Sequence, residues 1–98
     1  MTLRQAQESR GEATVAGHTL RPSFQALVAA EAELGPLFAL VERAADGRLA
    51  LGEMVALFWH CLTEPVDRDA FAEDVTAGGL AAATPALKTL LGQILGGR

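Results

Sequence analysis

Helix-breaking residues divide this sequence into short stretches, and their positions limit the fold more than any other feature does. Gly35-Pro36, Asp46-Gly47, Glu64-Pro65 and Gly78-Gly79 separate stretches that all contain several Ala and, except for residues 66–77, several Leu. Glycine ends helices because it tolerates the left-handed conformation after the last turn, and proline cannot continue one. Ala and Leu are among the strongest helix formers, so several short helices are predicted.

The apolar spacing within these stretches predicts five helices, over residues 24–34, 36–46, 51–63, 67–77 and 80–95. Ser23 and Asp67 are the expected N-caps of the first and fourth, because a side-chain oxygen there can accept a hydrogen bond from a free amide of the first turn. Three glycines are expected to end helices: Gly35, Gly47 and Gly79. For the last helix, a start at Leu80 with Pro85 inside is preferred to a shorter helix that starts at Pro85.

The sequence before the first helix has a different pattern. Residues 1–10 are polar without a sustained period, which is typical of a flexible tail. Residues 11–24 alternate between polar and apolar side chains, which predicts a β-hairpin with Gly17-His18 as its turn. That turn pairs Val15 with Leu20. It also places Pro22 where its missing N–H breaks no hydrogen bond of the hairpin, so that Pro22 blunts the outer edge against a third strand.

Composition favours a single, mostly helical domain of the α+β class over residues 11–95. Half of the 98 residues are hydrophobic, but there is no Tyr and only one Trp, so we expect a core of Leu, Ala and Val. A lone hairpin is marginal in water, and the predicted fold is therefore an N-terminal β-hairpin packed on a bundle of four to five short helices.

Charge and hydropathy exclude two classes of partner. The net charge of −4 argues against nucleic acid, because phosphate contacts need a basic face. No run approaches the roughly 18 apolar residues that cross a membrane, and the N-terminal residues are polar where a signal peptide is apolar. We therefore expect a soluble, cytoplasmic protein.

The stretch LFWHC, residues 57–61, holds the only Trp, the only Cys and one of two His. A helix turns by about 100° per residue, which separates these neighbours. Trp59 and Cys61 fall in a broad apolar band while His60 falls on the polar strip, so His60 cannot serve as the base of a Cys61 nucleophile. The two histidines do not complete a set of metal ligands. We expect no catalytic residue, no cofactor and no metal.

The apolar band of the 51–63 helix is wider than one-sided packing requires. Such a helix is either central in the fold, the preferred placement, or partly exposed to a partner. The last helix also has a dense apolar end. The candidate partner-binding residues are Phe58, Trp59, Leu91 and Leu95. Glu31, within the apolar stripe of the first helix, is interpreted as a structural carboxylate with Arg21 and the hairpin amides as expected partners.

Nearly the whole sequence resembles the small gene transfer agent family proteins of alphaproteobacteria, which are grouped with phage tail assembly chaperone-like and tail-tube-associated proteins. The segments that carry the resemblance are RGEATVAGHTLRPSF at 10–24, QALVAAEAELG at 25–35, LVERAADGRLALGEMVALFWHCL at 40–62 and DVTAGGLAAATPALKTLLGQIL at 74–95. Its most specific parts are EAELG at 31–35, DGRL at 46–49 and AGGL at 77–80. These are structural motifs and include no catalytic residue.

The resemblance implies a non-catalytic tail assembly protein of a phage-like gene transfer agent. Its implied role is a chaperone-like binder of the tape measure protein or the tail tube. A minor structural tail component retained in the particle is the alternative, and a small enzyme or regulator is disfavoured. Tail proteins are thus the expected partners, to the exclusion of nucleic acid and membranes, and weak self-association stays open. The expected location is the cytoplasm or the particle tail.

Overall fold

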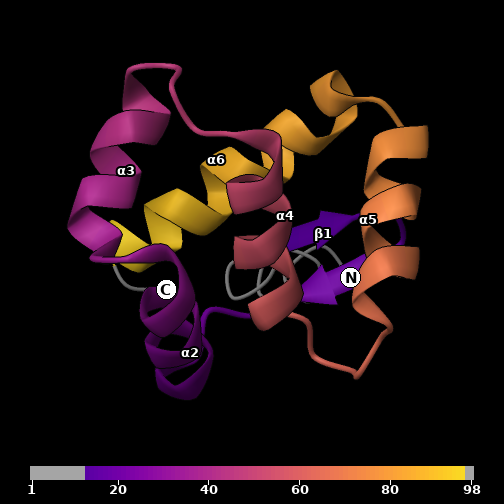
Figure 1. The fold of residues 1–98 in the computed structure, drawn as a ribbon, viewed down its shortest axis with the longest axis horizontal. Helices are drawn as coiled ribbons and strands as arrows, with labels where there is room; N and C mark the ends of the chain where they lie inside the picture. The colour runs from indigo at the N-terminus through magenta and orange to yellow at the C-terminus, as the bar shows by residue number, and fades with distance from the viewer. Residues whose placement is uncertain (1–12, 97–98) are drawn as a thin grey trace, which may run out of the picture.

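The computed structural model describes residues 13–96, which form a two-stranded antiparallel hairpin followed by five helices (Figure 1). The elements are β1 (Ala13–Val15), β2 (His18–Leu20), α2 (Phe24–Leu34), α3 (Leu37–Ala45), α4 (Leu51–His60), α5 (Arg68–Ala77) and α6 (Leu80–Gly96). The predicted fold class, a hairpin packed on a helical bundle, is confirmed. The predicted tail at 1–10 and the first two residues of the predicted hairpin lie outside the described residues.

Helix α4 lies in the middle of the molecule. Helices α2 and α5 pack on either side of it, α3 packs on α2, and α6 passes behind α4 to contact β1 and α5 (Figure 1). Five consecutive residues of α4, Met54 to Phe58, are buried. Side chains with no exposed surface come from nearly every element: Leu20, Ala30, Leu40, Leu57, Phe58, Phe71 and Leu90. The wide apolar band of α4 is therefore explained by its central position.

The hairpin turns one residue earlier than predicted. Ala16 and Gly17 form the turn, with φ values of 52° and 80°, which is the pattern of the tight turns that match strand twist. Val15 consequently pairs with His18, and Ala13 with Leu20. The predicted pairing of Val15 with Leu20 is wrong by two residues. Because side chains alternate with a period of two, this shift leaves Ala13, Val15 and Leu20 on the same buried face.

The outer edge of β2 is covered by the segment that follows α4. Leu20 forms an antiparallel bridge with Leu62, and the Thr63 N–H donates to the Thr19 carbonyl at 3.1 Å. The prediction that Pro22 blunts this edge is therefore wrong: Pro22 lies beyond β2, and the edge is occupied by the chain itself. This bridge also explains why α4 ends at His60, earlier than the predicted residue 63.

Local contacts cap α2 and α5 as expected from the sequence. Ser23 Oγ accepts the N–H of the residue three positions ahead at 3.2 Å, and Asp67 Oδ2 does the same at 3.0 Å. Gly35 follows α2 with φ 90° and donates its N–H to the Glu31 carbonyl. Each of these contacts joins residues close in sequence, which is why the pattern alone predicts them.

An ion pair joins α3 to α4 across the turn at Gly47. Arg43 donates to both carboxylate oxygens of Glu53, at 2.6 and 2.7 Å, and Glu53 also accepts the Ala50 N–H at 3.0 Å. The Arg43 guanidinium, together with the Ala50 amide, lowers the pKa of Glu53. Since Ala50 has no side-chain acceptor, Glu53 supplies the side-chain cap at this helix start.

Helix α6 starts at Leu80 and contains Pro85, which agrees with the longer of the two helices considered from the sequence. Pro85 has no N–H to donate to the Ala81 carbonyl, and Ala81 is exposed, so water can bind that carbonyl. The Thr84 hydroxyl donates to the Leu80 carbonyl at 3.2 Å, one residue before the proline. Proline is therefore tolerated near the start of this helix.

Candidate functional site

The structure buries most of the LFWHC stretch, residues 57–61. Phe58 has no exposed surface and Cys61 is 1% exposed. Burial raises the pKa of the Cys61 thiol to about 12, which disfavours the reactive thiolate at neutral pH. Phe58, a candidate partner-binding residue from the sequence, is instead a core residue, because α4 is enclosed by helices on both sides.

Trp59 and His60 contact side chains of neighbouring elements. Trp59 is half-buried, donates its Nε1–H to the Val66 carbonyl at 2.8 Å, and has the Arg68 guanidinium carbon 4.8 Å from its ring centroid. Glu33 lies 2.8 Å from His60 Nε2 and 2.5 Å from an Arg68 nitrogen, and these two partners lower the pKa of Glu33. This cluster connects α2, α4 and α5, which indicates a structural role for both residues of α4.

Neither a metal-ligand cluster nor a single membrane-spanning helix is present in the part of the chain that the structure describes. In residues 13–96 no three His, Cys, Asp or Glu side chains are grouped so that they could hold a metal ion. Within the same range no single helix is long and apolar enough to cross a membrane. Helices α2 and α3 together meet the length and composition required, but their axes are bent by 76°.

An open apolar groove lies between α2, α3 and the C-terminal end of α6. Its lining consists of Leu27, Glu31, Leu37, Phe38, Val41, Ile94 and Leu95, and its volume is about 240 Å³. Small-molecule sites usually occupy about 300 Å³ or more. The groove is therefore better suited to side chains of another protein than to a cofactor.

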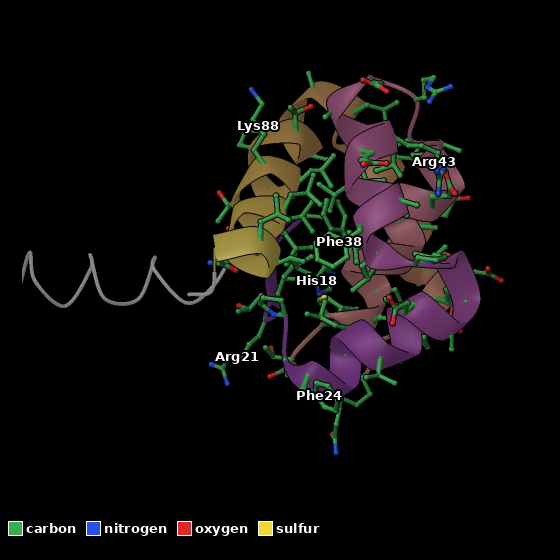
Figure 2. All side chains as sticks on the ribbon, turned by 90° about the vertical axis from the view of Figure 1, so that its left-hand side faces the viewer. His18, Arg21, Phe24, Phe38, Arg43 and Lys88 are labelled. Atoms are coloured by element: carbon green, nitrogen blue, oxygen red, sulfur yellow. The ribbon has the colours of Figure 1, made fainter. Side chains whose placement is uncertain are left out.

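Two of the lining side chains are strongly exposed. Phe38 is 78% exposed and Leu95 is 57% exposed. Figure 2 shows Phe38 on α3, on the side of the helix that faces α6. Burial of a Phe or Leu side chain is worth about 1.5–3 kcal/mol, so this groove can contribute substantially to binding once a partner covers it.

Glu31 lies in the groove and supports its wall. Its Oε2 accepts the N–H of Leu37, the first residue of α3, at 3.1 Å. A carboxylate is favourable there because the first amides of a helix carry partial positive charge. The structural carboxylate expected from the sequence thus binds an amide of α3, and not an amide of the hairpin.

Of the other two candidate residues from the sequence, Leu95 lines the groove and Leu91 is half-buried against the core. Phe38 was not singled out from the sequence. It falls outside the helical spacing of Leu37, Leu40 and Val41, and an aromatic residue off the apolar stripe is the signal that could have revealed it. Phe24 and Val28, apolar positions of α2, are also exposed, at 82% and 48%.

A second hollow, of about 450 Å³, lies beside the start of α2 and has a mixed polar and apolar lining. Two of its polar side chains already have partners, since Ser23 caps α2 and His60 binds Glu33. The apolar groove is therefore the stronger candidate for a protein-binding site.

Comparison with known proteins identifies one family. The family model described as "Phage tail tube protein, GTA-gp10" matches residues 8–97, nearly the whole chain. No curated protein and no solved structure matches the sequence. The resemblance to a gene transfer agent tail family is confirmed by this match.

Proposed function

This chain belongs to the phage tail tube protein family GTA-gp10, and from that premise we propose that it acts without catalysis in the assembly of a phage-like tail. In this proposal it binds an apolar segment of another tail protein, either the tape measure protein or the tail tube, and keeps that segment covered until assembly. The binding takes place in the bacterial cytoplasm, before the particle is complete.

The observation that carries the proposal is the open apolar groove between α2, α3 and α6. A chain of this size has little apolar surface to spare, yet Phe38 and Leu95 project into water beside a hollow that they line. Contiguous exposed apolar surface of this kind marks protein contacts in soluble domains.

The chemistry of the remaining polar residues supports a role without catalysis. Cys61 is buried with a raised pKa, and His60 is engaged by Glu33. Neither side chain points a reactive group into the apolar groove. A binding function needs no such group.

Coexpression with the tape measure and tail tube proteins of its own particle tests the proposal. We expect a stable complex with one of them, which Phe38→Ala weakens and Phe24→Ala does not. Phe24 is the matched control because it is a similarly exposed phenylalanine that does not line the groove. Binding to neither protein, or equal loss with both variants, contradicts the proposal.

A second function, a structural component retained in the tail, is favoured by the family to which the chain belongs, because that family is described as a tail tube protein. Quantitative mass spectrometry of purified particles separates the two. A chaperone-like protein is absent or present at trace level in finished particles. A retained component is present in a fixed number of copies relative to the tail tube.

A further inference from the structure

We infer that the groove between α2, α3 and α6 binds an amphipathic α-helix that carries Lys or Arg beside its apolar stripe. This inference rests on the proposed function and gives the chemistry of the partner at the same site. It follows from the shape of the groove and from the charges that border it.

The shape of the groove favours a helix. Its walls are themselves helices, and it is open to solvent along one side, where Phe38 and Leu95 project. Its volume of about 240 Å³ leaves room for one or two aliphatic side chains. A helix presents apolar side chains at every third or fourth position, and so inserts one or two of them into such a groove at a time.

The charges around the groove favour a basic partner. Glu31 is the one charged residue of the lining, and a single contact with the Leu37 amide occupies its Oε2. Glu42 is exposed one turn after Phe38 on the same face of α3. The neighbouring cation of α3, Arg43, is bound to Glu53 and does not neutralise this border.

The cation of α6, the third wall of the groove, is Lys88, and it lies apart from these carboxylates. Lys88 projects outward from α6, away from Phe38 (Figure 2). The α2 and α3 sides of the groove therefore present negative charge to a partner. Complementary charge beside an apolar contact fixes the register of the partner and raises its association rate.

A second copy of this chain fits the groove less well. A two-fold dimer across the groove brings the acidic border of both copies, formed by Glu31 and Glu42, into one interface. Like charges at an interface are unfavourable. The groove is accordingly assigned to a different protein with the opposite charge.

Two dye-labelled synthetic helical peptides test the inference on the full chain by fluorescence anisotropy. Both carry the same Leu spacing, and the positions that flank the Leu stripe are Lys in one peptide and Glu in the other. We expect the Lys peptide to bind about tenfold more tightly at low salt. The preference should be smaller at about 0.15 M salt, where ions screen exposed charges that are more than about 8 Å apart.

Matched variants separate the apolar contribution to peptide binding from the electrostatic one. Phe38→Ala should weaken both peptides, and Phe24→Ala should weaken neither. The double variant Glu31→Gln with Glu42→Gln should bring the two affinities close together, while Glu73→Gln, at an exposed position of α5 away from the groove lining, should not. Glutamine at position 31 still accepts the Leu37 N–H, and melting curves by circular dichroism verify that each variant is folded.

Several outcomes overturn the inference: equal binding of the two peptides, equal loss with the two Phe variants, or a dimer in sedimentation that Phe38→Ala dissociates. If neither peptide binds but a complete tail protein binds in a Phe38-dependent manner, the inference fails and the proposed function stands. If the Lys peptide binds in the groove and no tail protein does, the inference stands and the proposed function fails.

Discussion

Replacement of Phe58 by Ala tests whether α4 is the core of this protein, and Phe38→Ala is its matched control. The two side chains are chemically identical, but Phe58 has no exposed surface while Phe38 is 78% exposed. A buried Phe→Ala change typically costs about 3–5 kcal/mol, because apolar burial is lost and a cavity remains. A change at an exposed position usually alters stability by about 0.5 kcal/mol or less.

These magnitudes are large relative to the stability of a small domain. The free energy of unfolding for a domain of this size is about 5–15 kcal/mol, so Phe58→Ala removes a large part of it. Each kcal/mol shifts the melting midpoint of such a domain by about 4–8 °C, so a loss of about 3 kcal/mol lowers Tm by about 12 °C or more. Phe58→Leu, which retains more of the volume, should fall between Ala and the unchanged chain.

Urea unfolding provides the measurement, with circular dichroism as the main signal and Trp59 fluorescence as the second. We expect a strong loss for Phe58→Ala and nearly no change for Phe38→Ala. If both variants lose the same stability, Phe38 is part of the core and the groove is closed in solution. If neither loses stability, α4 is not the central helix and the packing argument is wrong.

Three further predictions follow from local geometry. Ala16→Asn should raise the free energy of unfolding in urea by up to about 1 kcal/mol, because Asn-Gly suits a turn in which both residues have positive φ; a clear loss would place the turn at Gly17-His18. Glu53→Gln should flatten the acid side of the stability profile. Arg43 holds the pKa of Glu53 below its ordinary value of 4.5, so the stability from this pair is present above pH 4.5 and is lost as the pH falls through the lower folded-state pKa; an unchanged profile contradicts the pair. Cys61 should react with a thiol reagent far more slowly in native buffer than in urea, because burial covers the sulfur and raises its pKa to about 12; equal labelling rates would show an accessible sulfur.

The helix ends were predictable because the contacts that set them are local. Ser23 and Asp67 each bind an amide three residues ahead, and Gly35 binds a carbonyl four residues behind. Such contacts depend on residue type and spacing alone. The same reasoning placed the start of α6 at Leu80, before Pro85.

The hairpin shows where local reasoning reached its limit. Its buried face was correct, because Val15 and Leu20 face the same way in either register. The turn was predicted one residue too late, because Ala16 takes a positive φ that is uncommon for a residue with a Cβ. Leu20 pairs with Leu62, and three helices separate these two residues in the sequence. This pairing supports the observed register and could not be predicted from the turn residues.

The candidate site was predictable only in part. Leu95 was named from the dense apolar end of the last helix, and it lines the groove. Phe58 was named from the same kind of pattern and lies in the core. A helical pattern reports how wide an apolar face is, but the packing of neighbouring helices determines which part of that face is covered.

Sequence patterns were sufficient to predict the class of the fold, the number and approximate limits of its helices, the capping residues and the separation of His60 from Cys61. These features depend on contacts between near neighbours or on the period of the apolar residues, which differs between helix and strand. The tertiary structure was needed to see that α4 is enclosed, that the edge of β2 is covered and that Phe38 projects beside an open groove. Those features depend on contacts between residues far apart in the sequence, and the energy of such contacts comes from burial that one helix cannot provide alone.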